Sequence, residues 1–152
     1  MIEIISYSDK YHSDFKRLNL EWLDKYSLTE SHDLMVLDDP NGTVLDRGGF
    51  IWLAKAGDEI IGSVALMNEG DGIFELAKMS VTAHWQGKGI SKILIETCLK
   101  KAIEIGVKKL TLFSNHQLQT ALKLYEKYGF KHVEVKDSPF ATADVRMELN
   151  LN

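Results

Sequence analysis

The stretch that most constrains this chain is VTAHWQGKGISKIL, residues 81–94. It follows an apolar run that ends at Val81, passes through a polar turn with two glycines, and enters an apolar pattern of helical spacing. A strand, a glycine turn and a helix in this order leave backbone N–H groups free at the start of the helix, where the helix dipole adds positive charge. The turn is therefore expected to bind an anion such as a phosphate group.

Two nucleotide-binding motifs do not fit this turn. A P-loop needs the pattern GxxxxGK[ST], which the segment lacks. Gly87 and Gly89 match the first two glycines of the dinucleotide fingerprint GxGxxG, but Lys92 stands in place of the third. Three antiparallel-looking strands also precede the turn, whereas that fingerprint follows the first strand of a βαβ unit. A nucleotide-binding regulator is therefore disfavoured.

The remaining pattern predicts an α/β fold with a mixed sheet. Strands are expected at residues 2–6, 50–56, 59–67, 73–81, 108–114, 130–135 and 143–151. Helices are expected at residues 8–26, from residue 29 to a turn at 39–42, and at residues 89–105 and 118–128. Gly106 and Gly129 are expected to end the last two helices. The order β-α-α-β-β-β-α-β-α-β-β describes a mixed sheet with helices on both faces.

Composition and charge fit one soluble domain, expected to span residues 1–152. The chain is 45% hydrophobic and 26% charged, with a formal net charge of −4, which lacks the basic surplus of a nucleic-acid binder. It shows neither a secretory signal nor a run of 18 apolar residues, so we expect a cytoplasmic protein that does not bind membranes. The single cysteine, Cys98, is expected to be buried, and the five histidines lack metal-binding spacing, so we expect no metal.

The pattern that does fit the turn is Q/R-x-x-G-x-G/A, through Gln86, Gly89 and Ser91. Together with ELAKMSV before it, NHQLQTALKLYEKYGF after it and the closing ADVRMEL, the chain resembles the GNAT superfamily of N-acetyltransferases over residues 50–150. Ser91 departs from the family's usual Gly or Ala, and Ala83-His84-Trp85 stands where members often have a proline. The GNAT fold is thereby implied for the whole chain.

The resemblance implies a function as well as a fold. It implies an N-acetyltransferase that uses acetyl-CoA as co-substrate and acetylates a primary amine, on a small molecule or a peptide, by direct attack in a ternary complex. A non-catalytic acyl-CoA-binding or sensing module on the same fold is the alternative. A homodimer also stays open, as does the acceptor: a protein N-terminus, a lysine side chain, a polyamine, an amino sugar or an antibiotic would suit the same cofactor half-site.

The resemblance assigns residues to the cofactor. The pyrophosphate cradle is implied to comprise Gln86, Gly87, Lys88, Gly89, Ile90, Ser91 and Lys92. The strand segment Met79, Ser80 and Val81 is implied to pair with the pantetheine arm, and the N–H of Met79 to donate to the thioester oxygen. Asn115 resembles a family contact to the pantetheine or phosphate region, although an asparagine there also caps helices without any ligand.

Two side chains are candidates for proton transfer. Tyr125 stands where many members carry a tyrosine near the thioester sulfur. Its role there is left open between donating a proton and donating only a hydrogen bond, and the alternative is that it only packs in the apolar stripe of its helix. Glu75 stands where some members carry a general base, and it is otherwise a surface glutamate at a strand edge. The ordinary pKa values are about 4.3 for a glutamate and about 10.4 for a lysine-type ammonium. A base role therefore needs a raised pKa for Glu75, a water relay or an amine of lower pKa.

Several other polar residues are weaker candidates. Glu21, Glu30 and Asp33 lie in the N-terminal helices, which resemble the family's substrate-side wall, and are candidates for amine recognition. His84 and His116 lie near the predicted cofactor cleft, where exposed loop positions are the simpler interpretation. Tyr128 is assigned to packing.

Overall fold

The computed structural model describes residues 1–151 and confirms the predicted order of elements. Seven strands form one sheet in the order β1-β2-β3-β4-β5-β7-β6. The strands are β1 (Ile2–Ser6), β2 (Phe50–Ala56), β3 (Glu59–Gly70), β4 (Ile73–Val81), β5 (Lys109–Ser114), β6 (Lys131–Val133) and β7 (Val145–Asn150). Neighbouring strands are antiparallel except β4 and β5, which are parallel, so the predicted mixed sheet is confirmed.

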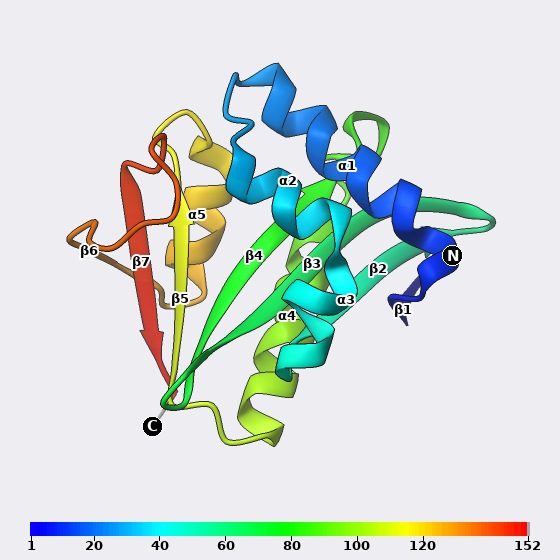
Figure 1. The fold of residues 1–152 in the computed structure, drawn as a ribbon. Coiled ribbons are helices and arrows are strands. Elements are labelled where there is room, and N and C mark those ends of the chain that lie inside the picture. The colour runs from blue at the N-terminus through cyan, green and yellow to red at the C-terminus, as the bar shows by residue number, and fades with distance from the viewer. Residues whose placement is uncertain (152) are drawn as a thin grey trace.

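Helices cover both faces of this sheet. They are α1 (His12–Lys25), α2 (Ser31–Asp38), α3 (Pro40–Thr43), α4 (Ile90–Glu104) and α5 (Gln119–Lys127), with single 3-10 turns at η1 (Asp9–Tyr11), η2 (Leu45–Arg47) and η3 (Ala83–Trp85). Figure 1 shows α1, α2 and α3 on one face and α4 and α5 on the other. Within residues 1–151, no helix combines the length and the apolar character needed to cross a membrane.

An apolar core fills each side of the sheet. β3 is buried continuously from Ile60 to Leu66, because helices pack on both of its faces. Val64 and Leu66 belong to the core beneath α4, whereas Ile60 and Ala65 belong to the core beneath α1 and α2. The two cores fix the helices on either side of the strands that carry the site.

Some boundaries differ from the sequence prediction. The turn expected at residues 39–42 is instead the start of α3, since the Asp39 carboxylate accepts from the N–H of Gly42 at 3.1 Å and Pro40 occupies the first helical position. β3 continues past Met67 to Gly70, and β6 keeps only three of the six residues expected. Gly106 and Gly129 end α4 and α5 as predicted.

β4 and β5 separate along their length. They pair only where Ile73–Glu75 lies beside Lys109–Thr111, although β4 continues to Val81 and β5 to Ser114. Figure 1 shows the two strands together at their lower ends and apart at their upper ends. The edge of β4 from residue 76 to residue 81 therefore has no strand on its β5 side.

β4 is also bulged at Lys78. Its register against β3 shifts near this residue, and Lys78 has a φ of +53°, a conformation that side-chain-bearing residues rarely adopt. The Ser63 hydroxyl donates to the Lys78 carbonyl at 2.7 Å, and the Asn19 amide donates to the Ser63 hydroxyl at 3.2 Å. Because all three residues are buried, β3 and α1 together hold the bulge in place.

The Lys78 side chain forms a buried ion pair with α2. Its Nζ lies 2.6 Å from Asp33 Oδ1, and both side chains are only 4% exposed. The other Asp33 oxygen accepts from the N–H of Glu30 at 2.9 Å, at the start of α2. Removing one partner of such a pair leaves the other charge buried without compensation.

Replacing Lys78 by methionine is expected to lower the free energy of unfolding by about 3 to 5 kcal/mol, because Asp33 then keeps an unpaired buried charge. Urea denaturation followed by circular dichroism measures this change. The double variant Lys78→Met with Asp33→Leu removes both charges and is expected to recover most of the loss. A double variant as unstable as the single one would contradict this explanation.

Candidate active site

A cleft of about 600 Å³ lies where β4 and β5 separate. Its walls come from β4, the turn before α4, the end of β5, α5 and α1. The predicted site residues that line it are Glu75, Met79, Ser80, Val81, Gln86, Gly87, Gly89, Ile90, Ser91, Lys92, Asn115 and Tyr125. Lys88 does not line it, and its Nζ lies 5.7 Å from the centre of the Trp85 ring.

The turn into α4 presents a run of free backbone N–H groups. Within residues 1–151, the N–H groups from Gly87 to Lys92 donate to no protein atom. Gly87 and Gly89 have φ values of +77° and +82°, and a Cβ added to either would meet nothing within 4 Å. The Gln86 side chain donates to the Val81 carbonyl at 3.0 Å and so closes the turn. This geometry offers several donors to one anionic group, at the positive end of a 15-residue helix.

The Asn115 side chain is engaged by the protein itself. Its amide donates to the Thr142 carbonyl at 2.8 Å, and its oxygen accepts from the N–H of Gln117 at 3.0 Å. It thereby joins the end of β5 to the loop before β7. Asn115 therefore has a structural role without any ligand, although it does not cap α5, for which the N-cap is Leu118. A cofactor contact by Asn115 stays a prediction.

Tyr125 lies on the α5 wall of the cleft and is 7% exposed. Its ring packs edge-on against Phe130, with centroids 5.8 Å apart, and its hydroxyl forms no hydrogen bond to any other residue in the described part of the chain. Burial raises the pKa of Tyr125 well above its ordinary value. The hydroxyl therefore keeps its proton at neutral pH and is suited to donate a hydrogen bond rather than to release the proton.

Glu75 is 6% exposed, so it is not the surface glutamate of the alternative interpretation. Burial raises the pKa of Glu75 to about 7, and the nearby charge of Glu69 acts in the same direction. Among residues 1–151, no donor forms a hydrogen bond to the Glu75 carboxylate. A carboxyl group that is half ionised near neutral pH and has no protein partner meets the requirement for a general base.

The three acidic residues expected to recognise an amine all have protein partners instead. Glu21 accepts from the N–H of Ala83 at 2.9 Å, and Glu30 accepts from the N–H groups of Ala141 and Thr142 at 2.8 and 2.9 Å. Asp33 pairs with Lys78. These carboxylates fasten α1 and α2 to the rest of the site, and a role for them in amine recognition stays a prediction.

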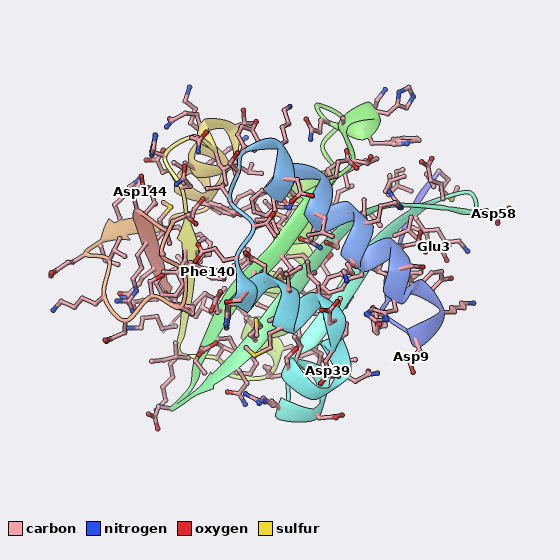
Figure 2. All side chains as sticks on the ribbon, turned by 45° about the horizontal axis from the view of Figure 1, so that its top comes forward. Glu3, Asp9, Asp39, Asp58, Phe140 and Asp144 are labelled. Carbon is pink, nitrogen blue, oxygen red and sulfur yellow. The ribbon has the colours of Figure 1, made fainter. Side chains whose placement is uncertain are left out.

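The sequence patterns did not identify the aromatic residue Phe140, which lines the cleft together with Phe113. Phe140, in the loop between β6 and β7, lies with its ring 4.9 Å from that of His32, 6.4 Å from that of Phe113 and 5.2 Å from Lys78 Nζ. Figure 2 shows Phe140 on this loop, beside α2.

The pairing of Lys78 with Asp33 was also not predicted. The one signal for it in the sequence is a lysine inside the apolar strand ELAKMSV, where a buried charge needs a partner.

The other reactive side chains lie outside the cleft. His84 and His116 are exposed, and the imidazole Nδ1 of His116 is paired with Asp144. Cys98 is fully buried, and burial raises the pKa of its thiol, which opposes any thiolate role. In residues 1–151, no three His, Cys, Asp or Glu side chains gather closely enough to hold a metal ion.

Comparison with known families gives a match across this region. The profile of the Acetyltransferase (GNAT) domain matches residues 47–132. N-acetylaspartate synthetase of Xenopus tropicalis is 38% identical over 89 residues, which are 58% of this chain and 33% of that protein. The chain therefore spans about a third of the length of this curated relative.

Solved structures share the whole architecture. An acetyltransferase of the GNAT family from Staphylococcus aureus Mu50 superposes with a TM-score of 0.93 at 21% identity, covering 100% of both chains. The PaiA N-acetyltransferase of Thermoplasma acidophilum, solved in complex with coenzyme A, has a TM-score of 0.79 at 18% identity and covers 99% of each chain. At these identities the likeness shows the fold.

Replacing Glu75 by glutamine is expected to remove a pH-dependent loss of stability. Unfolding returns the carboxyl to water, so the folded protein keeps a proton, between the ordinary pKa of 4.5 and about 7, that the unfolded chain has lost. The stability due to the neutral carboxyl is complete below the lower value and is lost as the pH rises through the upper one. At 1.36 kcal/mol for each pKa unit, the advantage of Glu75→Gln grows by up to about 3 kcal/mol from pH 4 to pH 8.

Denaturation curves at several pH values measure this difference. The control is Glu59→Gln, at the exposed first position of β3, which removes no buried carboxyl. Parallel pH profiles for the unaltered protein and Glu75→Gln would show that Glu75 ionises as it does in water.

Proposed function

Because this chain belongs to the GNAT acetyltransferases, we propose that it binds acetyl-CoA in the cleft and transfers the acetyl group to the primary amine of a small molecule. The observation that carries this proposal is the run of free N–H groups from Gly87 to Lys92, at one end of a cleft that also contains Glu75 and Tyr125. The name of the Xenopus relative supports a small acceptor, since it refers to an acetylated amino acid.

The residues of the turn fit a diphosphate. Six consecutive N–H groups and the ammonium of Lys92 all favour negative charge. The acidic side chains that line the cleft in residues 1–151, Asp33 and Glu75, do not belong to the turn. Between Glu75 and the turn lies the stretch from residue 76 to residue 81, about 20 Å at 3.3 Å per strand residue. An extended arm can therefore run along β4 with its anionic end at α4 and its reactive end near Glu75.

Bound acetyl-CoA would supply the acetyl group as a thioester. The free edge of β4 at Met79, Ser80 and Val81 is the backbone available to hold the pantetheine arm, and the N–H of Met79 is the proposed donor to the acetyl oxygen. The bulge at Lys78 changes the direction of the backbone immediately before Met79. Ser63 and Asn19 would then position the donor without touching the substrate.

Glu75 is the proposed acceptor of the amine proton. Its pKa of about 7 lies within about one unit of the α-amino group at a peptide N-terminus, for which the ordinary pKa is about 7.7 to 8.0, but more than three units below a lysine ammonium at about 10.4. The α-ammonium of a free amino acid, beside its own carboxylate, lies between these two, so proton transfer from it to Glu75 costs less than from a lysine-type amine. Tyr125 is the proposed hydrogen-bond donor to the sulfur that leaves.

Gly89→Ala is expected to weaken acetyl-CoA binding about 10-fold or more, because alanine disfavours the positive φ of +82° that Gly89 adopts in the turn. A loss of about 1.4 kcal/mol in the free energy of binding corresponds to a factor of ten in affinity. Gly106→Ala is the matched control, because Gly106 also has a positive φ of +77° and open space around it, but at the other end of α4. Both variants should lose similar stability, and only Gly89→Ala should lose affinity in isothermal titration calorimetry. No binding of acetyl-CoA to the unaltered protein would overturn the cofactor assignment.

Tyr125→Phe is expected to lower kcat about 10- to 100-fold with little change in acetyl-CoA affinity, because a hydrogen bond to a charged group contributes about 1.5 to 3 kcal/mol. A panel of primary amines with detection of the released thiol measures this. Tyr128→Phe is the control, since the Tyr128 hydroxyl binds Glu96 at 2.7 Å on the exposed side of the helices. Binding of acetyl-CoA without turnover of any amine would instead favour a non-catalytic acyl-CoA-binding module.

A further inference from the structure

A second cavity, of about 410 Å³, adjoins the cleft at Glu75. Glu75 and Phe113 line both cavities, so the proposed base borders both spaces. The second cavity lies on the α2 side of the sheet, where Thr111, paired with Glu75 in the parallel strands, also lines it. The remaining walls come from η2, the end of β3, the loop between β6 and β7, and β7. A molecule held here would have one end beside Glu75.

Three cationic side chains line this cavity. Within residues 1–151, the guanidinium of Arg47 forms neither a hydrogen bond nor an ion pair, because the contact of this residue with Asn68 uses the Arg47 carbonyl. Lys136 has only an exposed pairing with Glu134 at 3.6 Å, which contributes little. Arg146 is fixed by Glu148 at 3.2 Å. Arg47 is therefore the cation with its whole guanidinium available for a ligand.

Negative charge lines the same cavity, and part of it acts on Glu75. Glu69 lines the cavity and raises the pKa of Glu75 through its charge, and Asp137 lines it from the loop before β7. His32 adds no charge at neutral pH, because burial and the charge of Lys78 lower its pKa. A cavity with an acidic group, Glu69, near the proposed base and an unpaired arginine in its wall suits a molecule that carries both an ammonium and a carboxylate.

We propose that this second cavity holds the carboxylate of the acceptor, so that the acceptor is a free amino acid whose amine lies at Glu75 and whose carboxylate binds Arg47. The proposal rests on the acetyltransferase function proposed above and adds the substrate class. A guanidinium presents two parallel N–H donors that match the two oxygens of a carboxylate. Arg146 and Lys136 add positive potential to the same wall.

The test compares acceptors that differ only in the carboxylate. Each protein amino acid with a primary α-amine is assayed beside its carboxamide and its decarboxylated amine, with acetyl-CoA as donor and detection of the released thiol. At least one amino acid is expected to be used with a kcat/KM about 10- to 100-fold above that of its carboxamide, the effect of one hydrogen-bonded charge. Equal use of the carboxamide, or turnover only of amines without a carboxylate, would overturn the carboxylate pocket and leave the acetyltransferase function intact.

Arg47→Gln identifies the residue responsible. It is expected to raise KM for the preferred amino acid about 10- to 100-fold, to leave the carboxamide unchanged, and to leave KM for acetyl-CoA unchanged. Arg17→Gln is the matched control, because Arg17 lies on α1 and lines neither cavity. Equal losses on the acid and the carboxamide in Arg47→Gln would overturn the assignment. No turnover of any amine by the unaltered protein would overturn the proposed function together with the pocket.

Discussion

The bulge of β4 at Lys78 is the feature on which the rest of the site depends. A residue with a side chain in the left-handed conformation costs about 1 to 3 kcal/mol and persists only where its surroundings enforce it. Here the Ser63 hydroxyl holds the Lys78 carbonyl from β3, and Asp33 holds the Lys78 ammonium from α2. The bulge is thus held on both sides of the chain, in the part of β4 that has already separated from β5.

Because β4 separates from β5, the two ends of β4 lie in different surroundings. Where the strands still pair, Glu75 lies buried beside Thr111. Where they have separated, the edge of β4 is open as far as the turn into α4, with its free N–H groups. The two ends differ in charge, because the turn favours anions whereas Glu75 and Glu69 favour cations. Under the proposed function, the single strand β4 sets the distance between the diphosphate and the amine.

Sequence patterns predicted the parts of this arrangement that are local in the chain. The glycine turn, the helix that follows it and the helix with Tyr125 each come from one continuous segment. The order of the elements along the chain is likewise a property of successive segments. Contacts between distant segments could not be predicted in the same way. Glu30 binds Thr142 across 112 positions of the chain, and Asp33 binds Lys78 across 45. In the sequence alone, nothing distinguishes these carboxylates from acids on a solvated surface, so their structural partners could not be predicted.

The ion pair of Lys78 and Asp33 also bears on the pKa of Glu75, on which its proposed role as a base depends. Lys78 is three residues from Glu75, and its charge alone would lower the pKa of that carboxyl, whereas the charge of Asp33 acts in the opposite direction. With the two charges 2.6 Å apart, Asp33 opposes the effect of Lys78 on Glu75, and burial is the largest influence, followed by the charge of Glu69. The same pair that stabilises the bulge therefore leaves Glu75 with a pKa near neutrality. A free lysine at this position would hold the carboxylate ionised and make it a weaker base.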